Sequence, residues 1–276
     1  MDRRSALRFF RNLLCGVLIG AGTILPGISG TVLAVVFGVY RPMMEIFTSP
    51  RRALPRFWPM IPPLAVGWAV GFLVFAKWVH VAYSLAPAAT VWLFIGLIAG
   101  TFPALWREAG KEGRGAGAYA AFVLCALLAF AGLFYAHHIA RMQVTPNFFW
   151  YSFCGMLWGM STVVPGMTSS SVMMALGLYE PMLRKLAEMD LLTLSACLPA
   201  MVLTIALLAR AVTALMRRYY AAFFHAVAGV VAATTLVIVP LHYEGTKEIA
   251  LSVLACAIGF AIAYWMARLD SALPKE

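Results

Sequence analysis

Two short stretches of the sequence place hydroxyl-bearing side chains directly after a Pro-Gly pair, inside otherwise apolar surroundings. The first reads PGISGT at residues 26–31, and the second reads PGMTSSS at residues 165–171. Proline lacks the N–H that would continue a helix, so each pair predicts a break after which a new helix begins. The first N–H groups of a helix have no intrahelical acceptor and carry partial positive charge, and nearby hydroxyls add donors. This chemistry suits an oxyanion, either a phosphate or a carboxylate.

The candidate substrate-binding residues follow from this chemistry, because glycine lets an oxyanion approach the backbone while serine and threonine donate to it. The alternative is that these small residues only allow close helix packing or cap the half-helices. The sequence shows neither a nucleophile triad nor a metal-ligand cluster, so we expect no catalytic residue, no metal and no cofactor. The candidates are Pro26, Gly27, Ser29, Gly30, Thr31, Pro165, Gly166, Thr168, Ser169, Ser170 and Ser171, with Arg41, Arg141 and Glu180 as charged residues near the ends of the site.

The two stretches belong to a longer internal similarity. An offset of 139 residues pairs hydroxyl with hydroxyl, Ser29 with Thr168 and Thr31 with Ser170. So many matches in apolar sequence indicate a duplication, with repeats at residues 6–138 and 145–268 of a single membrane domain, residues 1–276. Seven of the identical pairs at this offset are Gly16/Gly155, Gly20/Gly159, Pro26/Pro165, Gly27/Gly166, Gly38/Gly177, Tyr40/Tyr179 and Pro42/Pro181.

The composition of the chain indicates whether it folds in water or in a membrane. Hydrophobic residues make up 63% of it and charged residues 12%, and the mean hydropathy is +0.86, whereas a soluble domain carries about 25% charged residues. This is the composition of an integral membrane protein. The net charge of +10 could suggest a nucleic-acid partner, but the basic residues cluster in short links between apolar runs, as in membrane proteins. We therefore expect no nucleic-acid partner.

The elements that must position the two stretches are helices. Six of the apolar runs approach the roughly 20 residues that a helix needs to cross a bilayer, and the four that flank the Pro-Gly pairs are shorter. The short pairs form either tight spanning hairpins or re-entrant hairpins that turn back inside the membrane, and their polar tips favour the second. The prediction is an all-α polytopic membrane protein. Its ten apolar runs are 9–25, 30–47, 58–79, 86–106, 117–138, 147–164, 169–187, 191–215, 221–240 and 249–267.

The order of crossings predicts the topology. Each hairpin returns the chain to the side it came from and three crossings follow, so the second repeat is inverted relative to the first. The basic N-terminus could suggest a signal peptide, but no small-residue cleavage site follows, and we predict a retained first membrane segment. Both termini are predicted to be cytoplasmic, because basic residues concentrate on the inner side. Sixteen lie inside (Arg3, Arg4, Arg8, Arg11, Arg41, Arg51, Arg52, Arg56, Arg107, Lys111, Arg114, Arg210, Arg217, Arg218, Arg268, Lys275) and five outside (Lys77, Arg141, Arg184, Lys185, Lys247).

The stretches PGISGTVLAVVFGVY and PGMTSSSVMMALGLYEP resemble the paired signatures of a bacterial family catalogued as domain of unknown function 368 and associated with polyprenyl-phosphate (undecaprenyl-phosphate) translocases. Its first signature typically reads Pro-Gly-x-Ser-Gly-Gly-Thr and ends in Gly-x-Tyr-Glu. Here Thr31 stands at the second glycine, Val32 at the threonine and Arg41 at the glutamate. In the second repeat Thr168 and Ser169 replace the usual Ser-Gly.

The resemblance implies a flippase that returns undecaprenyl phosphate across the cytoplasmic (inner) membrane, so that the lipid carrier is recycled for cell-envelope synthesis. The partners would be the lipid and the bilayer, with a proton or sodium ion as the candidate coupling ion. The phosphate would bind between the two hairpin tips near the midplane, and Arg41 or Arg141 would guide it at the mouths. Glu180 could carry the coupling proton, although solvation of a helix end is the favoured explanation.

Two alternatives remain. The first is an ion-coupled carrier of a small soluble anion, because the physics of its site would be similar. The second is an undecaprenyl-diphosphate phosphatase, whose relatives also have inverted repeats, a Pro-Gly-x-Ser-Arg-Ser signature and an intramembrane Glu-x-x-x-Glu. Gly30 and Ser169 stand at the arginine position here, and both Glu-x-x-x-Glu matches, residues 108–112 and 244–248, fall in polar loops. We therefore expect no enzyme.

Overall fold

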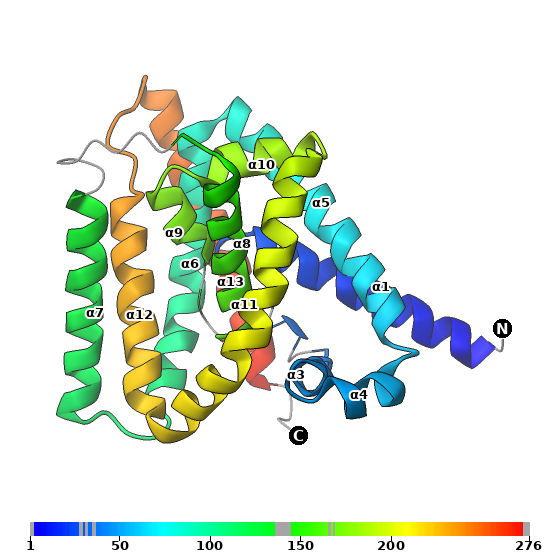
Figure 1. Ribbon diagram of the computed structural model, residues 1–276. Helices are drawn as coiled ribbons and strands as arrows, with labels where there is room; N and C mark the ends of the chain where they lie inside the picture. Colours follow the sequence, from blue (N-terminus) through cyan, green and yellow to red (C-terminus); the bar gives the residue numbers. More distant parts are fainter. Residues whose placement is uncertain are drawn as a thin grey trace.

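The structure is a computed structural model that describes residues 3–27, 30, 33–34, 37–135, 145–164, 167 and 169–272. All regular secondary structure in these residues is helical, which confirms the predicted all-α class (Figure 1). The first half contains α1 (Arg3–Ile24), α3 (Tyr40–Thr48), α4 (Pro50–Phe57), α5 (Ile61–Leu85), α6 (Pro87–Ala109) and α7 (Ala116–Phe134). The second half contains α8 (Phe148–Val163), α9 (Ser169–Ala175), α10 (Tyr179–Ala187), α11 (Leu191–Arg218), α12 (Tyr220–Val237) and α13 (Thr246–Ala272).

Seven helices in the described residues are long and apolar enough to cross a membrane, namely α1, α5, α6, α7, α11, α12 and α13. This is one more than the six expected from the apolar runs. The additional one is α1, because the helix begins at Arg3, well before the apolar run 9–25. The chain is therefore a polytopic membrane protein whose first helix is longer than predicted.

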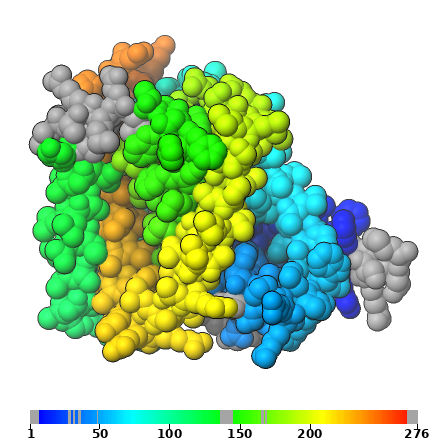
Figure 2. Space-filling model, in the orientation of Figure 1, coloured from blue at the N-terminus to red at the C-terminus, as the bar shows by residue number. Residues whose placement is uncertain are grey.

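The outer surface of the bundle is apolar, as a lipid-facing surface must be. Figure 2 shows one face, to which α7 and α11 contribute long continuous surfaces. Large aliphatic side chains are exposed along both helices, among them Leu127 and Leu128 on α7 and Leu203 and Leu207 on α11. In water such a surface would drive aggregation, whereas in a bilayer it meets acyl chains.

The packing of the helices shows the duplication directly. In the first half α1 packs against α5, and in the second half α8 packs against α11. The remaining helices exchange partners between the halves, since α6 packs against α13 while α12 packs against α7. Exchanging the two halves leaves this set of pairs unchanged, so the fold consists of two intertwined repeats. The repeat boundaries 6–138 and 145–268 stay a prediction.

Glycines at matched positions explain why the first helix of each repeat approaches its partner so closely. A Cβ on Gly16 would overlap the carbonyl oxygen of Leu64 on α5, and one on Gly155 would overlap that of Cys197 on α11. The backbones are therefore in contact at equivalent places in both repeats. The identity of these glycines across the duplication follows from that contact.

A second break divides each apolar run that follows a Pro-Gly pair. Runs 30–47 and 169–187 were expected as single segments, but each turns at a glycine with left-handed backbone, Gly38 with φ +69° and Gly177 with φ +70°. The Leu178 N–H donates to the Met173 carbonyl at 2.9 Å, which is the hydrogen bond of a glycine-terminated helix end. As a result α3 and α10 are separate helices that can pack independently of the hairpin tips.

Candidate functional site

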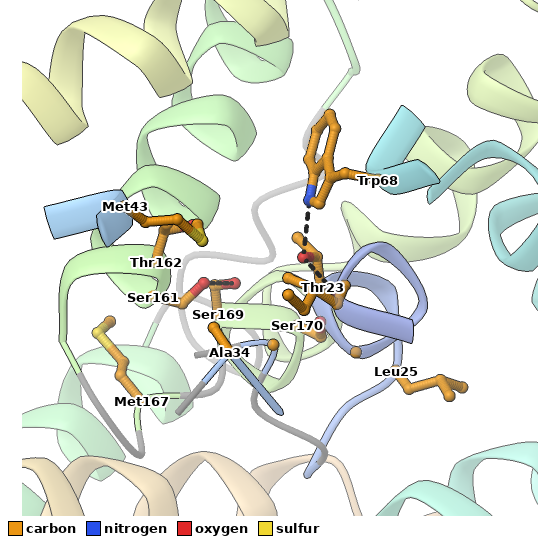
Figure 3. Close-up of a pocket in the computed structure, with 13 residues that line it drawn as sticks. Thr23, Leu25, Ala34, Met43, Trp68, Ser161, Thr162, Met167, Ser169 and Ser170 are labelled. Atoms are coloured by element: carbon orange, nitrogen blue, oxygen red, sulfur yellow. Dashed lines mark hydrogen bonds between the residues drawn. The ribbon is translucent and has the colours of Figure 1, made fainter. Parts of the chain in front are cut away.

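A small cavity of about 40 Å³ lies where the two repeats meet (Figure 3). It has room for about three water molecules. Residues from both repeats form its wall, so its shape depends on how the two halves pack together. The lining residues are Ile19, Gly22 and Thr23 of α1, Leu25, Gly30, Ala34, Met43 of α3, Trp68 of α5, Ser161 and Thr162 of α8, Met167, and Ser169 and Ser170 of α9.

Repeat-related residues face one another across this cavity. Thr23 and Thr162 are separated by the repeat offset of 139 residues, and so are Gly30 and Ser169. The cavity therefore lies on the internal twofold relation between the halves. The Thr23/Thr162 identity is visible in the sequence at this offset, but both threonines precede the Pro-Gly pairs and were not among the predicted binding residues.

The indole of Trp68 supplies one donor to the cavity wall. Its Nε1–H donates to the Thr23 hydroxyl at 3.3 Å, which is a long hydrogen bond, and Thr23 in turn donates to the Ile19 carbonyl at 3.0 Å. Stacking on Phe72, with ring centroids 4.9 Å apart, fixes the position of the Trp68 ring. Because its present bond is long, this N–H can be redirected toward an anion at small energetic cost.

Three hydroxyls of the second repeat are hydrogen-bonded on the opposite wall, and two of them form a short chain. Ser169 donates to Ser161 at 3.1 Å, and Ser161 donates to the Trp158 carbonyl at 3.0 Å. Thr162 donates to the same carbonyl at 2.9 Å. Ser169 stands at the head of this chain and is only 2% exposed. Its hydroxyl proton is shared with another hydroxyl rather than with the backbone, so it is the donor most easily released to a ligand.

The carbonyl at the end of α1 is covered by the second repeat. Ile24 accepts hydrogen bonds from the Ser170 hydroxyl at 3.1 Å and from the Tyr179 hydroxyl at 2.8 Å. The last carbonyls of a helix have no intrahelical donor and carry partial negative charge, which repels an anion. These two hydroxyls therefore satisfy the helix end and reduce its repulsion beside the cavity.

The predicted binding residues divide into three groups in the structure. Gly30, Ser169 and Ser170 line the cavity. Pro26, Gly27 and Ser171 are buried beside it but do not line it, and Arg41 and Glu180 lie farther along the chain on α3 and α10. The third group lies outside the described residues and consists of Ser29, Thr31, Pro165, Gly166, Thr168 and Arg141.

Two of the neighbours have contacts of their own. Gly27 has φ +81°, and a Cβ there would meet the backbone of Leu97 and Ile98 in α6, so this glycine permits close packing. Ser171 points toward α12, where the Thr234 hydroxyl donates to it at 3.1 Å. Both residues support the frame of the cavity from outside its wall.

The two charged candidates lie in different settings. Arg41 is exposed on the first turn of α3. Glu180 lies 3.8 Å from His80 Nδ1 on α5, and this nitrogen is buried without a hydrogen-bond partner among the residues that the structure describes. Sequence reasoning missed His80, because nothing in the local sequence relates it to a residue in the other repeat.

The wall of the cavity is neutral. None of its described lining residues is arginine, lysine, aspartate or glutamate, and among the described residues no three His, Cys, Asp or Glu side chains gather as metal ligands would. A wider, open cavity of about 480 Å³ lies elsewhere and includes Tyr83, His242, Glu244 and Glu248 in its wall. Its two carboxylates disfavour an anion, so the neutral hydroxyl-lined cavity is the candidate site.

Comparison with known proteins gives one match. A family model described as VCA0040-like, undecaprenyl phosphate translocase-like, matches residues 3–114 and 112–253. The two matched regions follow the two halves of the chain. No curated protein and no solved structure matches it.

Proposed function

We propose that this chain moves undecaprenyl phosphate or a similar polyprenyl phosphate across the cytoplasmic membrane. The reason is its family, since the chain belongs to the VCA0040-like family of undecaprenyl phosphate translocase-like proteins. The step would recycle the lipid carrier for cell-envelope synthesis. A phosphate crossing hydrocarbon alone loses its hydration, which is very costly. The protein would lower this cost by supplying donors to the headgroup while the isoprenoid tail stays among the lipids.

The observation that carries the proposal is the hydroxyl-lined cavity between the repeats of an otherwise apolar helical bundle. Ser169, Thr162 and the Trp68 indole supply neutral donors from different helices. Each exchanges an internal hydrogen bond for one to a phosphate oxygen, so the net gain per donor is modest. Modest binding suits a carrier, which must release the headgroup on the other side.

The route to the cavity extends the proposal. Arg41 and Arg141 would guide the headgroup at the two entrances of the cavity. Ser29, Thr31 and Thr168 would donate to it from the hairpin tips. The hairpins would be re-entrant, and both termini would be cytoplasmic, in keeping with the sixteen inner and five outer basic residues counted above. The pairing of Glu180 with His80 supports a proton rather than sodium as the coupling ion, because both side chains can exchange protons.

A carrier of a small soluble anion is the second candidate, and the small volume of the cavity favours it. We propose no enzymatic activity. Glu108 of the first Glu-x-x-x-Glu match bonds to Lys111 and Tyr220, away from the cavity. Glu248 of the second match accepts from the Glu244 N–H at the start of α13. Neither match supplies a carboxylate to the cavity.

Reconstitution into liposomes separates these candidates. The purified protein is incorporated into vesicles with a fluorescent polyprenyl phosphate, and the fraction accessible to a membrane-impermeant quencher is followed in time. We expect faster exchange between leaflets than in protein-free vesicles, with no inhibition by millimolar inorganic phosphate. Uptake of radiolabelled phosphate without lipid exchange would favour the soluble-anion carrier, and release of phosphate from a polyprenyl diphosphate would favour the enzyme.

A further inference from the structure

The helices α3 and α10 are repeat-related but are packed to different depths. Both begin at a tyrosine, Tyr40 and Tyr179, and both span nine residues. On α10 the residues Tyr179, Met182, Leu183 and Leu186 are at most 1% exposed. Their counterparts on α3, which are Tyr40, Met43, Met44 and Phe47, are all only half-buried.

The partners of these two helices are also repeat-related. The helix α10 packs against α5, and α3 lies against α11, the counterpart of α5, over a smaller contact. Figure 1 shows α10 and α3 at opposite ends of the bundle. The protein thus has two equivalent docking positions at its two ends, one closely filled and one loosely filled.

A hydrogen bond marks the filled position. The Tyr179 hydroxyl donates to the Ile24 carbonyl at 2.8 Å, which ties the start of α10 to the end of α1. The repeat-related pair is Tyr40 and Val163, and no corresponding bond joins them among the described residues. The asymmetry is therefore present in packing and in hydrogen bonding at once.

The cavity follows the same asymmetry. Met43 of α3 lines it, whereas none of its described lining residues belongs to α10. A loosely packed helix therefore bounds the cavity, and the closely packed α10 contributes no described residue to its wall.

We infer that Tyr179 and Tyr40 are alternating positioning residues, and that transport exchanges the Tyr179–Ile24 hydrogen bond for a Tyr40–Val163 bond. This inference rests on the proposed function, since it describes how that carrier opens its site to either leaflet. Repeats of matched sequence can adopt each other's conformation, so docking α3 and releasing α10 gives a second state of similar free energy. In that state the cavity is open at the α10 end and closed at the α3 end.

Distances between two pairs of spin labels measure how closely α10 packs on α5 and α3 packs on α11 in the full-length protein in liposomes. One pair joins residue 188 at the end of α10 with residue 81 on α5, and the other joins residue 49 at the end of α3 with residue 215 on α11. All four native side chains are exposed. Cys125 and Cys256 are half-buried and are replaced by alanine, while Cys15, Cys154 and Cys197 are buried and stay unlabelled.

The variant Tyr179→Phe keeps the ring and removes the hydroxyl. We expect it to raise the population with α10 released about fivefold, corresponding to about 1 kcal/mol for one net hydrogen bond, and to shorten the α3–α11 distance. The variant Ser170→Ala, which removes the other donor to Ile24, changes both distances in the same direction. Tyr40→Phe lowers the population with α3 docked, and Tyr243→Phe, a tyrosine bonded elsewhere, leaves both distances unchanged.

The outcomes separate this inference from the proposed function. Opposite changes at the two ends in Tyr179→Phe and Tyr40→Phe support alternation whatever the substrate proves to be. Equal loosening at both ends, or no change at either, would mean that the tyrosines are only structural and would overturn it. Alternation without exchange of polyprenyl phosphate would overturn the substrate assignment alone, and lipid exchange without alternation would overturn this inference alone.

Discussion

Replacing Ser169 with alanine removes one hydroxyl from the cavity wall and leaves the wall otherwise intact. In the structure this hydroxyl donates to Ser161, which keeps its own bond to the Trp158 carbonyl, so the variant leaves no buried donor without an acceptor. In the proposed bound state Ser169 donates to phosphate. A hydrogen bond to a charged group contributes about 1.5–3 kcal/mol and a neutral one about 0.5–1.5 kcal/mol, so the exchange gains about 1–1.5 kcal/mol.

This difference corresponds to about a five- to tenfold loss of affinity for the headgroup, because 1.4 kcal/mol is tenfold. At polyprenyl phosphate concentrations below saturation, leaflet exchange by Ser169→Ala should be slower by the same factor. Ser169→Thr, which keeps a hydroxyl, should retain more of the rate. The matched control is Ser195→Ala on the lipid-facing side of α11, where the exposed serine hydroxyl donates to the Leu192 carbonyl of its own helix. Full activity in Ser169→Ala, or an equal loss in Ser195→Ala, would refute the assignment of this donor.

Two further predictions concern stability. Gly155→Ala should lower the free energy of unfolding by about 1–3 kcal/mol, and with it the thermal midpoint, because its Cβ would overlap the backbone of α11. The control Gly117→Ala, at a position that faces open space, should change the thermal midpoint little. Comparable midpoints for the two variants would contradict the packing. Hydrogen bonds from the side chain and then the backbone N–H of Thr193 lower the pKa of Asp190 from its ordinary value of 3.8. The lowered pKa means that Asp190 stabilises the fold above pH 3.8 and that this contribution is lost as pH falls through the folded-state value. Wild type and Asp190→Asn should therefore differ in thermal midpoint at pH 7 and approach each other as the pH is lowered. A difference that does not shrink with falling pH would contradict this prediction.

The duplication made much of the fold predictable. An offset read from Pro26 and Pro165 also gives the equivalence of α3 and α10, whose first residues Tyr40 and Tyr179 are matched in the sequence. Gly155 was matched to Gly16 by the same offset, and the structure explains the match, because each glycine contacts the backbone of its partner helix. These features are local or periodic, so the sequence carries them directly.

Other features depend on packing between distant segments. The breaks at Gly38 and Gly177 were missed because an apolar run looks the same whether one helix or two pass through it. Three consecutive serines were proposed as ligands, yet successive helix residues are about 100° apart. Only Ser169 and Ser170 line the cavity, and Ser171 turns toward α12.

Trp68 could not be found from the sequence, because its role depends on where α5 crosses the end of α1. No motif surrounds it. In the second repeat Met201 stands at the corresponding contact, since Gly159 meets its backbone as Gly20 meets that of Trp68. The packing of α7 against α12 and of α13 against α6 could likewise not be predicted, since α7 and α13 are uniformly apolar. Such features arise from the three-dimensional association of the repeats and leave no periodic signal.

The most direct test of the central claim is whether a polyprenyl phosphate occupies the cavity between the repeats. A photoreactive benzoylphenylalanine replaces Met167 in the cavity wall, and in a control protein it replaces the lipid-facing Leu207. We predict that position 167 crosslinks a labelled polyprenyl phosphate saturably and is competed by unlabelled lipid, while position 207 crosslinks polyprenyl phosphate and phosphatidylglycerol alike without saturation. Unsaturable crosslinking at both positions would contradict the account.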